Sequence, residues 1–239
     1  MNPSSRHPWH RQLHPFGLYG ARGSRELDRA AIENFGIPGE TLMEIAGTRA
    51  ADWIQQHELP NAEGIILAGK GNNGGDAYVV ARLLHEYGIQ VQVFSLVQVS
   101  SLTADALLNA QRWLSLGGEI TVFLDADEEN KKAHLEKIKV ESVKLSLNKT
   151  AKTHFSKALA TADFIVDGLL GIGINGPVSA SHEEIINLVN KATNASMIHK
   201  YALDIPSGLH PDTGRCMGSA FSVDFTFCFG GIKPGYFLE

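Results

Sequence analysis

The sequence is poor in cysteine and in basic charge, and it has no long apolar run. Two cysteines in 239 residues are too few for a disulfide framework, which favours a reducing, cytosol-like compartment. The formal net charge of −5 gives none of the basic excess that marks nucleic-acid-binding proteins. No apolar run approaches the ~20 residues that a transmembrane helix needs. We therefore expect neither a nucleic acid nor a membrane as a partner.

The start of the chain lacks both a signal-like apolar stretch and helical periodicity. Residues 1–17 are rich in histidine, arginine and proline, and we expect a disordered lead. A cytoplasmic location is expected, and a mitochondrial one stays open for a eukaryotic protein because the first 16 residues hold two arginines and no acid. Residues 18–239 are long enough for one large α/β domain with its own core.

The centre of the chain carries a strand, a glycine-rich turn and a helix in succession. Residues 65–68 (IILA) are typical of a buried parallel strand, and residues 69–75 form the turn. A helical pattern then runs to Gly88, where a helix would stop, and residues 89–97 form a second apolar strand. These elements predict a βαβ unit.

The glycine turn lacks the marks of two common nucleotide sites. A dinucleotide fingerprint needs an acidic residue ~20 positions further on. Residues 87–104 contain none, so a plain NAD site is disfavoured. The turn also lacks the Lys-Ser/Thr pair of a P-loop, which disfavours a nucleoside triphosphatase. We expect Asp76 to cap the free amides where the helix begins, and its charge would repel a phosphate there.

The remaining segments alternate between helical and strand patterns. Ser24 is the expected cap of a first helix that ends at Gly36, and Ser181 opens a capping box with Glu184. The lysine-rich residues 125–161 predict one or two solvent-exposed helices. Further helices are expected over residues 42–54 and 103–116, and further strands over residues 120–124, 164–167, 201–204 and 225–229. This alternation predicts an α/β fold with a mostly parallel central sheet.

Three polar loops leave the carboxyl ends of predicted strands, where ligands bind in parallel sheets. Each loop carries one aspartate: Asp76, Asp167 and Asp204. Carboxylates brought together raise one another's pKa, and either an oxygen-bound cation or a ligand with hydroxyl groups relieves that repulsion. The side-chain oxygens of Asn73, Asp167 and Ser207, with loop carbonyls, suit a hard cation. The sequence shows no Cys/His cluster of the zinc type.

Five segments resemble one known family. They are GNNGGD at residues 71–76, VDGLLGIGINGP at residues 166–177, LDIPSG at residues 203–208, RELDRAAIENFGIPGETLMEIAG at residues 25–47 and FCFGGIKPG at residues 227–235. Together they are similar to the YjeF N-terminal domain family, the NAD(P)H-hydrate epimerases. The first three motifs, in this order, are far more specific than one glycine loop.

The resemblance implies a Rossmann-like three-layer α/β/α sandwich, usually a homodimer, with one potassium ion in each subunit. It implies an isomerase that interconverts the R and S forms of hydrated NADH and NADPH, a nicotinamide nucleotide repair reaction. Carried over by motif, potassium would bind Asn73, Asp167 and Ser207. The hydrated dinucleotide would contact Asn72, Asn73, Gly74, Gly75, Asp76, Gly171, Ile172, Gly173, Ile174, Asn175, Gly176, Pro177 and Asp204.

Asp204 is the expected catalytic residue. Carbon 6 of the hydrated nicotinamide ring carries a hydroxyl that the ring nitrogen can expel, and water adding to the opposite face gives the other epimer. One positioned carboxylate can serve as both acid and base. Asp204 ends a strand before a rigid Ile205-Pro206 turn, whereas we expect helix amides to occupy Asp76 and the cation to occupy Asp167.

The chain departs from the family pattern at two points. Ala77 stands where the family usually has glycine, at a cost of about 1 kcal/mol if that position needs a positive φ and none if it is helical. The chain ends soon after Gly235, where family members usually continue with another strand, so we expect a shortened form. Two alternatives stay open: a non-catalytic scaffold or RNA-associated module, as in mRNA-decapping proteins, and a lipoprotein-associated role.

Overall fold

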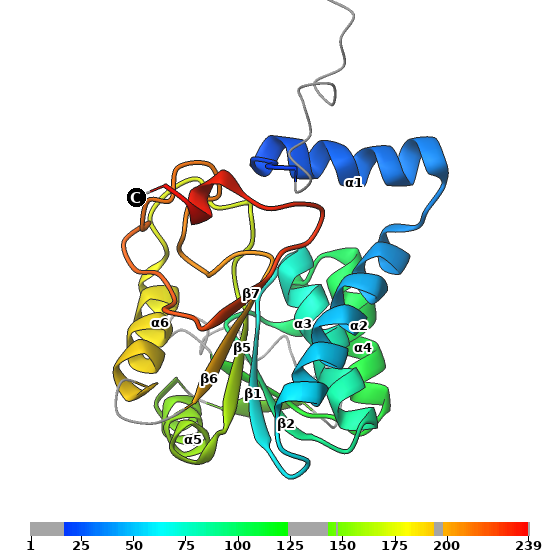
Figure 1. The fold of residues 1–239 in the computed structure, drawn as a ribbon. Coiled ribbons are helices and arrows are strands. Elements are labelled where there is room, and N and C mark those ends of the chain that lie inside the picture. The colour runs from blue at the N-terminus through cyan, green and yellow to red at the C-terminus, as the bar shows by residue number, and fades with distance from the viewer. Residues whose placement is uncertain (1–16, 124–142, 147, 194–197, 239) are drawn as a thin grey trace, which may run out of the picture.

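The structure, a computed structural model, describes residues 17–123, 143–146, 148–193 and 198–238 (Figure 1). Within these ranges seven strands form one sheet in the order β4-β3-β2-β1-β5-β6-β7, and every neighbouring pair is parallel. The strands are β1 Glu63–Ala68, β2 Gln90–Ser95, β3 Ile120–Phe123, β4 Val143–Ser146, β5 Phe164–Gly168, β6 His199–Leu203 and β7 Phe225–Phe227. The predicted parallel α/β architecture is confirmed.

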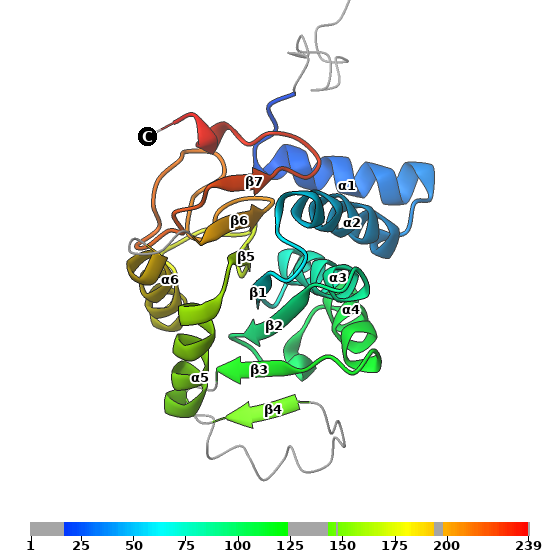
Figure 2. The same ribbon diagram turned by 60° about the horizontal axis from the view of Figure 1, so that its bottom comes forward.

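Helices cover both faces of the sheet (Figure 2). α2, α3 and α4 pack on one face, and α5 and α6 pack on the other. The helices are α1 Ala21–Phe35, α2 Gly39–His57, α3 Asn72–Glu86, α4 Ala104–Ser115, α5 Asn148–Thr161 and α6 Ala180–Thr193, with 3-10 turns η3 Val99–Ser101 and η5 Pro234–Tyr236. None of the described helices combines the length and apolar character needed to cross a membrane.

The central strand β1 is apolar because both of its faces are covered. Ile66 packs into the core under α2, α3 and α4, whereas Ile65 and Leu67 pack into the core under α5 and α6. Successive strand side chains point to opposite faces, so a strand between two helical layers needs an uninterrupted apolar run. The uninterrupted apolar run that predicted this strand is therefore a consequence of its central position in the sheet.

The order in which the chain adds strands to the sheet reverses at β1. From β1 the chain moves outward through β2, β3 and β4, and then returns to lay β5, β6 and β7 on the other side of β1. Such a switch point leaves a crevice at the carboxyl ends of the two central strands, here β1 and β5. α1 lies apart from the two layers, across this end of the sheet (Figure 1).

Two predicted helix caps are wrong. α1 begins at Ala21, so Ser24 lies buried inside the helix, and Asp212 Oδ1 accepts the Ala21 N–H instead (2.8 Å). α6 begins at Ala180, and Ser179 Oγ accepts the His182 N–H (3.4 Å) in place of the predicted box that Ser181 opens. Both helices start earlier than their apolar periodicity indicates, since a first turn does not need to contact the core.

The lysine-rich segment contains a strand as well as a helix. β4 lies at the edge of the sheet and pairs with β3, although only helices were expected there. α5 confirms the expected helix, but its apolar side chains, including Phe155, are buried against the sheet. Residues 124–142 lie outside the described residues, as does the predicted disordered lead except for Gly17.

Candidate active site

Hydrogen bonds join the loops that follow β1, β5 and β6 at the end of the sheet. The Gly69 N–H donates to Gly168 O (3.0 Å), and Asn73 Nδ2 donates to Leu170 O (2.9 Å). The Leu170 N–H in turn donates to Ser207 Oγ (2.8 Å). The structure therefore brings together the three loops that the sequence placed at one rim.

Asp167 lies at the buried centre of this junction, with 1% of its surface exposed. Its Oδ1 accepts hydrogen bonds from Ser207 Oγ (2.6 Å) and Leu169 N (3.2 Å), and its Oδ2 accepts one from Ser207 N (2.7 Å). Burial raises the pKa of Asp167 to about 6, although these donors lower it. Asp167 is thus mainly ionised at neutral pH and ties the β6 loop to the β5 loop.

One oxygen in the junction has no hydrogen bond. Asn73 is buried, and its Oδ1 has no partner among the described residues. Because Asn73 Nδ2 and Ser207 Oγ both bind the backbone of Leu170, Asn73 Oδ1 belongs to the same junction as Asp167. An orphaned amide oxygen grouped with a carboxylate and a hydroxyl fits a hard, oxygen-bound cation.

Two glycines allow the close approach of these loops. A Cβ on Gly69 would collide with the carbonyl oxygen of Leu169, and one on Gly74 would collide with the carbonyl oxygen of Gly69. Ala77 is different, because it lies within α3, and Asp204 is the only non-glycine residue with positive φ in the described ranges. Alanine therefore has no conformational cost at position 77.

The structure places Asp76 inside α3 and not at its start. The helix begins at Asn72 with Gly71 as N-cap, and no side chain caps it, so the expected capping role of Asp76 is wrong. Asp76 is 8% exposed, and its carboxyl group accepts no hydrogen bond from the part of the chain that the structure describes. Burial raises the pKa of Asp76 well above its ordinary value, and the charges of Asp204 and Asp28 raise it further.

Asp204 follows β6 in a left-handed conformation with φ 59°. Its Oδ1 accepts hydrogen bonds from Phe229 N (3.4 Å) and from the Lys233 ammonium group. The Tyr236 hydroxyl donates to the Asp204 backbone carbonyl. Burial raises the pKa of Asp204, whereas the charge of Lys233 lowers it. The C-terminal segment therefore fixes the direction of this carboxylate.

Sequence reasoning missed three residues near Asp204: Lys233, Tyr236 and Asp28. Lys233 is completely buried, and its Nζ also donates to Phe229 O (2.6 Å). Asp28, from α1, comes close to the C-terminal segment at Gly230. A lone charge in the motif FCFGGIKPG could have indicated Lys233. Asp28 gave no such signal, because only the tertiary structure brings α1 to this rim.

The second predicted substrate loop, residues 171–177, begins against the glycine turn. A Cβ on Gly171 would stand 3.2 Å from Asn73 Cβ, so the two loops touch at their bases. Farther out, the exposed residues are Asn72 of the turn and Gly173, Asn175 and Pro177 of the loop. This accessible, uncharged surface adjoins the buried junction.

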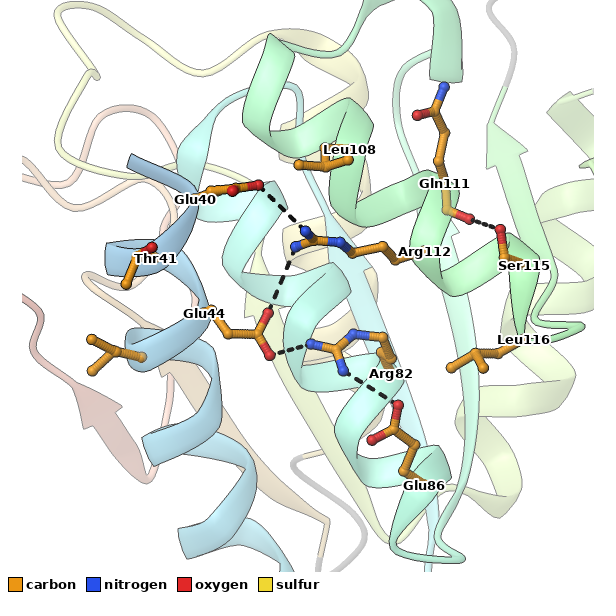
Figure 3. A pocket seen from close by; sticks show the side chains of 11 residues that line it. Glu40, Thr41, Glu44, Arg82, Glu86, Leu108, Gln111, Arg112, Ser115 and Leu116 are labelled. Carbon is orange, nitrogen blue, oxygen red and sulfur yellow. Dashed lines mark hydrogen bonds and ion pairs between the residues drawn. The ribbon is translucent and has the colours of Figure 1, made fainter. Parts of the chain in front are cut away.

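A separate groove of about 740 Å³ lies between α2, α3 and α4 (Figure 3). Its arginines are paired with its glutamates: Arg82 with Glu44 and with Glu86 (3.3 Å), and Arg112 with Glu40 (3.3 Å). Asp76, Asp167 and Asp204 are all absent from the lining of this groove. We therefore place the candidate active site at the strand ends and not here.

Two relatives align with nearly the whole chain. It is 34% identical over 212 residues to "NAD(P)H-hydrate epimerase" of Rhodopirellula baltica, covering 89% of this chain and 74% of that relative. It is also 34% identical over 217 residues to "Bifunctional NAD(P)H-hydrate repair enzyme Nnr" of Moorella thermoacetica. That alignment covers 90% of this chain, which spans only 36% of the bifunctional relative.

A solved structure and a family model agree with these relatives. The crystal structure of yeast ynu0 superposes with a TM-score of 0.71 at 18% identity, covering 93% of this chain and 84% of the yeast chain, and shows the same fold. The family model described as YjeF-related protein N-terminus matches residues 39–235. The chain therefore belongs to the YjeF-related protein N-terminus family.

Proposed function

We propose that this protein epimerises the R and S forms of hydrated NADH and NADPH, as a nicotinamide nucleotide repair enzyme. The observation that carries the proposal is the pair of carboxyl groups, buried Asp76 and partly exposed Asp204, beside glycine loops at the switch point of the sheet. Its 34% identity to a relative named NAD(P)H-hydrate epimerase supports the assignment.

The reaction needs proton transfer and a site that tolerates positive charge. The lone pair of the ring nitrogen expels the hydroxyl at carbon 6, which leaves as water after protonation, and the ring becomes an iminium ion. Water then adds to the opposite face and loses a proton. Nearby carboxylates stabilise the developing positive charge. No oxidant or reductant takes part.

The dinucleotide would lie along the two glycine loops, residues 72–76 and 171–177. Glycines at these loops let the backbone approach a ligand closely. The exposed side-chain amides of Asn72 and Asn175 can donate hydrogen bonds to ribose or phosphate oxygens. We assign the nicotinamide end to the carboxyl groups of Asp76 and Asp204 and the remainder to this accessible surface.

Potassium is the proposed cofactor, with one ion in each subunit. Asn73 Oδ1, Asp167 and Ser207 would hold it, and the orphaned oxygen of Asn73 is the observation that supports the fit. A bound cation would offset the buried charge of Asp167. It would therefore hold the loops after β5 and β6 in register, which orders Asp204 at the end of β6.

A cytoplasmic homodimer is the proposed form of the protein. Cys216 and Cys228 are both free, which suits a reducing compartment.

Exposed apolar side chains, Ile45 (54%) and Leu116 (45%), border the groove of Figure 3, as expected for an interface. Light scattering should show a dimer that Ile45→Asp dissociates. Leu59→Asp, at an exposed position two residues beyond the end of α2, should leave it intact, and a monomeric wild type would contradict the proposal.

Chromatography tests the function. Pure protein mixed with one epimer of the NADH hydrate should bring the R and S forms to equilibrium far faster than buffer alone. Circular dichroism checks that the protein is folded. If the R and S forms then equilibrate only at the spontaneous rate, the assignment is wrong. A filter assay with RNA distinguishes the non-catalytic alternative, for which RNA binding without epimerisation is expected.

A further inference from the structure

The carboxyl groups of Asp76 and Asp204 have opposite hydrogen-bonding environments. Asp204 accepts hydrogen bonds from the Lys233 ammonium group and from Phe229 N. Asp76 accepts none from the described residues and lies buried in the second turn of α3. A cation beside one carboxylate favours its ionised form, whereas burial without hydrogen-bond donors favours a neutral acid.

We propose that the proton transfers are divided between these groups: Asp76 gives a proton to the departing hydroxyl, and Asp204 takes one from the attacking water. Lys233 is a positioning residue that keeps Asp204 ionised and fixes its direction. The proposal rests on the epimerase function and revises the expectation that Asp204 serves as both acid and base. Paired groups with opposed environments are a general sign of separate acid and base roles.

The neighbouring charges support this division. Asp28 of α1 contributes negative charge near both groups, and burial and Asp204 raise its own pKa, whereas Lys233 lowers it. Cys228 and Tyr236 also face Asp204, and burial raises the pKa of each. Lys233 is therefore the only cation among the described groups that interact with this cluster, and its hydrogen bond goes to Asp204 and not to Asp76.

The chemistry balances over one turnover. The bond between carbon 6 and its oxygen breaks, the oxygen takes the Asp76 proton, and water leaves. A second water forms the new bond to carbon 6 on the other face, and its proton goes to Asp204. Asp76 is then ionised and Asp204 protonated, which is the arrangement needed for the reverse epimerisation. Water at the partly exposed Asp204 side chain (15%) can return the proton.

The test is the pH dependence of epimerisation by the full chain with NADH hydrate. Wild-type kcat should fall at alkaline pH as Asp76 loses its proton and at acid pH as Asp204 gains one. Asp76→Asn should lower kcat by roughly 10²–10⁴-fold, leave KM nearly unchanged and abolish the alkaline limb. Asp204→Asn should give a similar loss but abolish the acid limb.

Two further variants sharpen the result. Lys233→Met should move the acid limb to higher pH, because Asp204 loses the cation that favours its ionised form. Asp52→Asn is the matched control: Asp52 accepts a hydrogen bond from Tyr87 at the far end of α3, and asparagine can still accept it (2.7 Å). Its pH profile should match that of the wild type.

The outcomes separate this proposal from the proposed function. If wild-type protein does not accelerate epimerisation, the function itself is wrong. If the wild type is active but Asp76→Asn has a kcat within about threefold of the wild-type value, or keeps the alkaline limb, Asp76 is not the acid. Should Asp76→Asn fail to fold, the wild-type profile decides: an alkaline limb that persists in Asp204→Asn supports the division, and its absence overturns it.

Discussion

Lys233 and Asp204 form a salt bridge between the C-terminal segment and the end of β6, the strand whose loop completes the candidate site. The lysine side chain is fully buried, whereas 15% of the Asp204 side chain is exposed. Removal of an ammonium group from water is costly unless a carboxylate and other acceptors replace the lost hydration, as Asp204 and Phe229 O do here. The salt bridge therefore links the position of the C-terminal segment to the charge of the site.

Removal of Lys233 should destabilise the protein more than removal of the whole pair. Lys233→Met leaves the Asp204 charge without its cation, so unfolding in urea should show a loss of about 3–5 kcal/mol. Asparagine tolerates the left-handed backbone of residue 204, so Asp204→Asn adds no backbone strain. The double variant Asp204→Asn/Lys233→Met should lose less than Lys233→Met alone, because no uncompensated charge is left. Additive losses would argue against a direct energetic coupling.

Potassium should stabilise the protein only above about pH 6. The raised pKa of Asp167, about 6, means that the folded state binds this proton more tightly than the unfolded state, in which the pKa is 3.8. Without a cation, this group's contribution to stability therefore decreases as pH rises from 3.8 to about 6 and is constant above it. Because potassium competes with the proton, its apparent affinity should weaken about tenfold per pH unit below that value.

Melting temperatures in potassium chloride and tetramethylammonium chloride measure this effect. A higher melting temperature in potassium is expected at pH 7.5, with no difference near pH 4. Asp167→Asn, which lacks the charge, should show little difference at either pH. Equal wild-type melting temperatures in the two salts at pH 7.5 would contradict the proposed potassium site.

Gly74→Ala should disturb the glycine turn, whereas Gly71→Ala should not. The new Cβ at position 74 would collide with the backbone carbonyl of Gly69, while a Cβ at position 71 has no neighbour within 4 Å. Overpacking of this kind costs about 1–3 kcal/mol. Urea unfolding and epimerase activity of the two variants compare them directly, and equal behaviour would contradict the close approach of the loops.

Asp212→Ala should loosen α1 and with it the position of Asp28. The Asp212 carboxylate accepts the first N–H of the helix, and loss of such a cap costs about 1 kcal/mol. Arg22→Ala, which removes the solvent-exposed ion pair with Glu26, should have little effect on stability. Faster amide hydrogen exchange over residues 21–35 in Asp212→Ala, but not in Arg22→Ala, is the expected result. Unchanged exchange in both would show that another contact holds α1.

The parallel α/β architecture and the three loops of the site were predictable from the sequence. Alternating apolar strands and amphipathic helices are local patterns, so β1 and β5 were predicted close to their observed positions. The rule that ligands bind at the carboxyl ends of parallel strands then placed Asp76, Asp167 and Asp204 at one rim. No packing detail was needed, since strand direction alone fixes which ends meet.

The environment of each carboxyl group, in contrast, depends on how the whole chain packs. Asp76 was expected to cap the helix because residues 72–75, which are rich in glycine, were interpreted as a turn, whereas the helix already begins at Asn72. The ion pair of Asp204 with Lys233, the approach of Asp28 and the cap from Asp212 join residues far apart in the chain, and no local pattern encodes them. The protonation of a carboxyl group depends on its burial and its neighbours, and those follow from how distant segments pack.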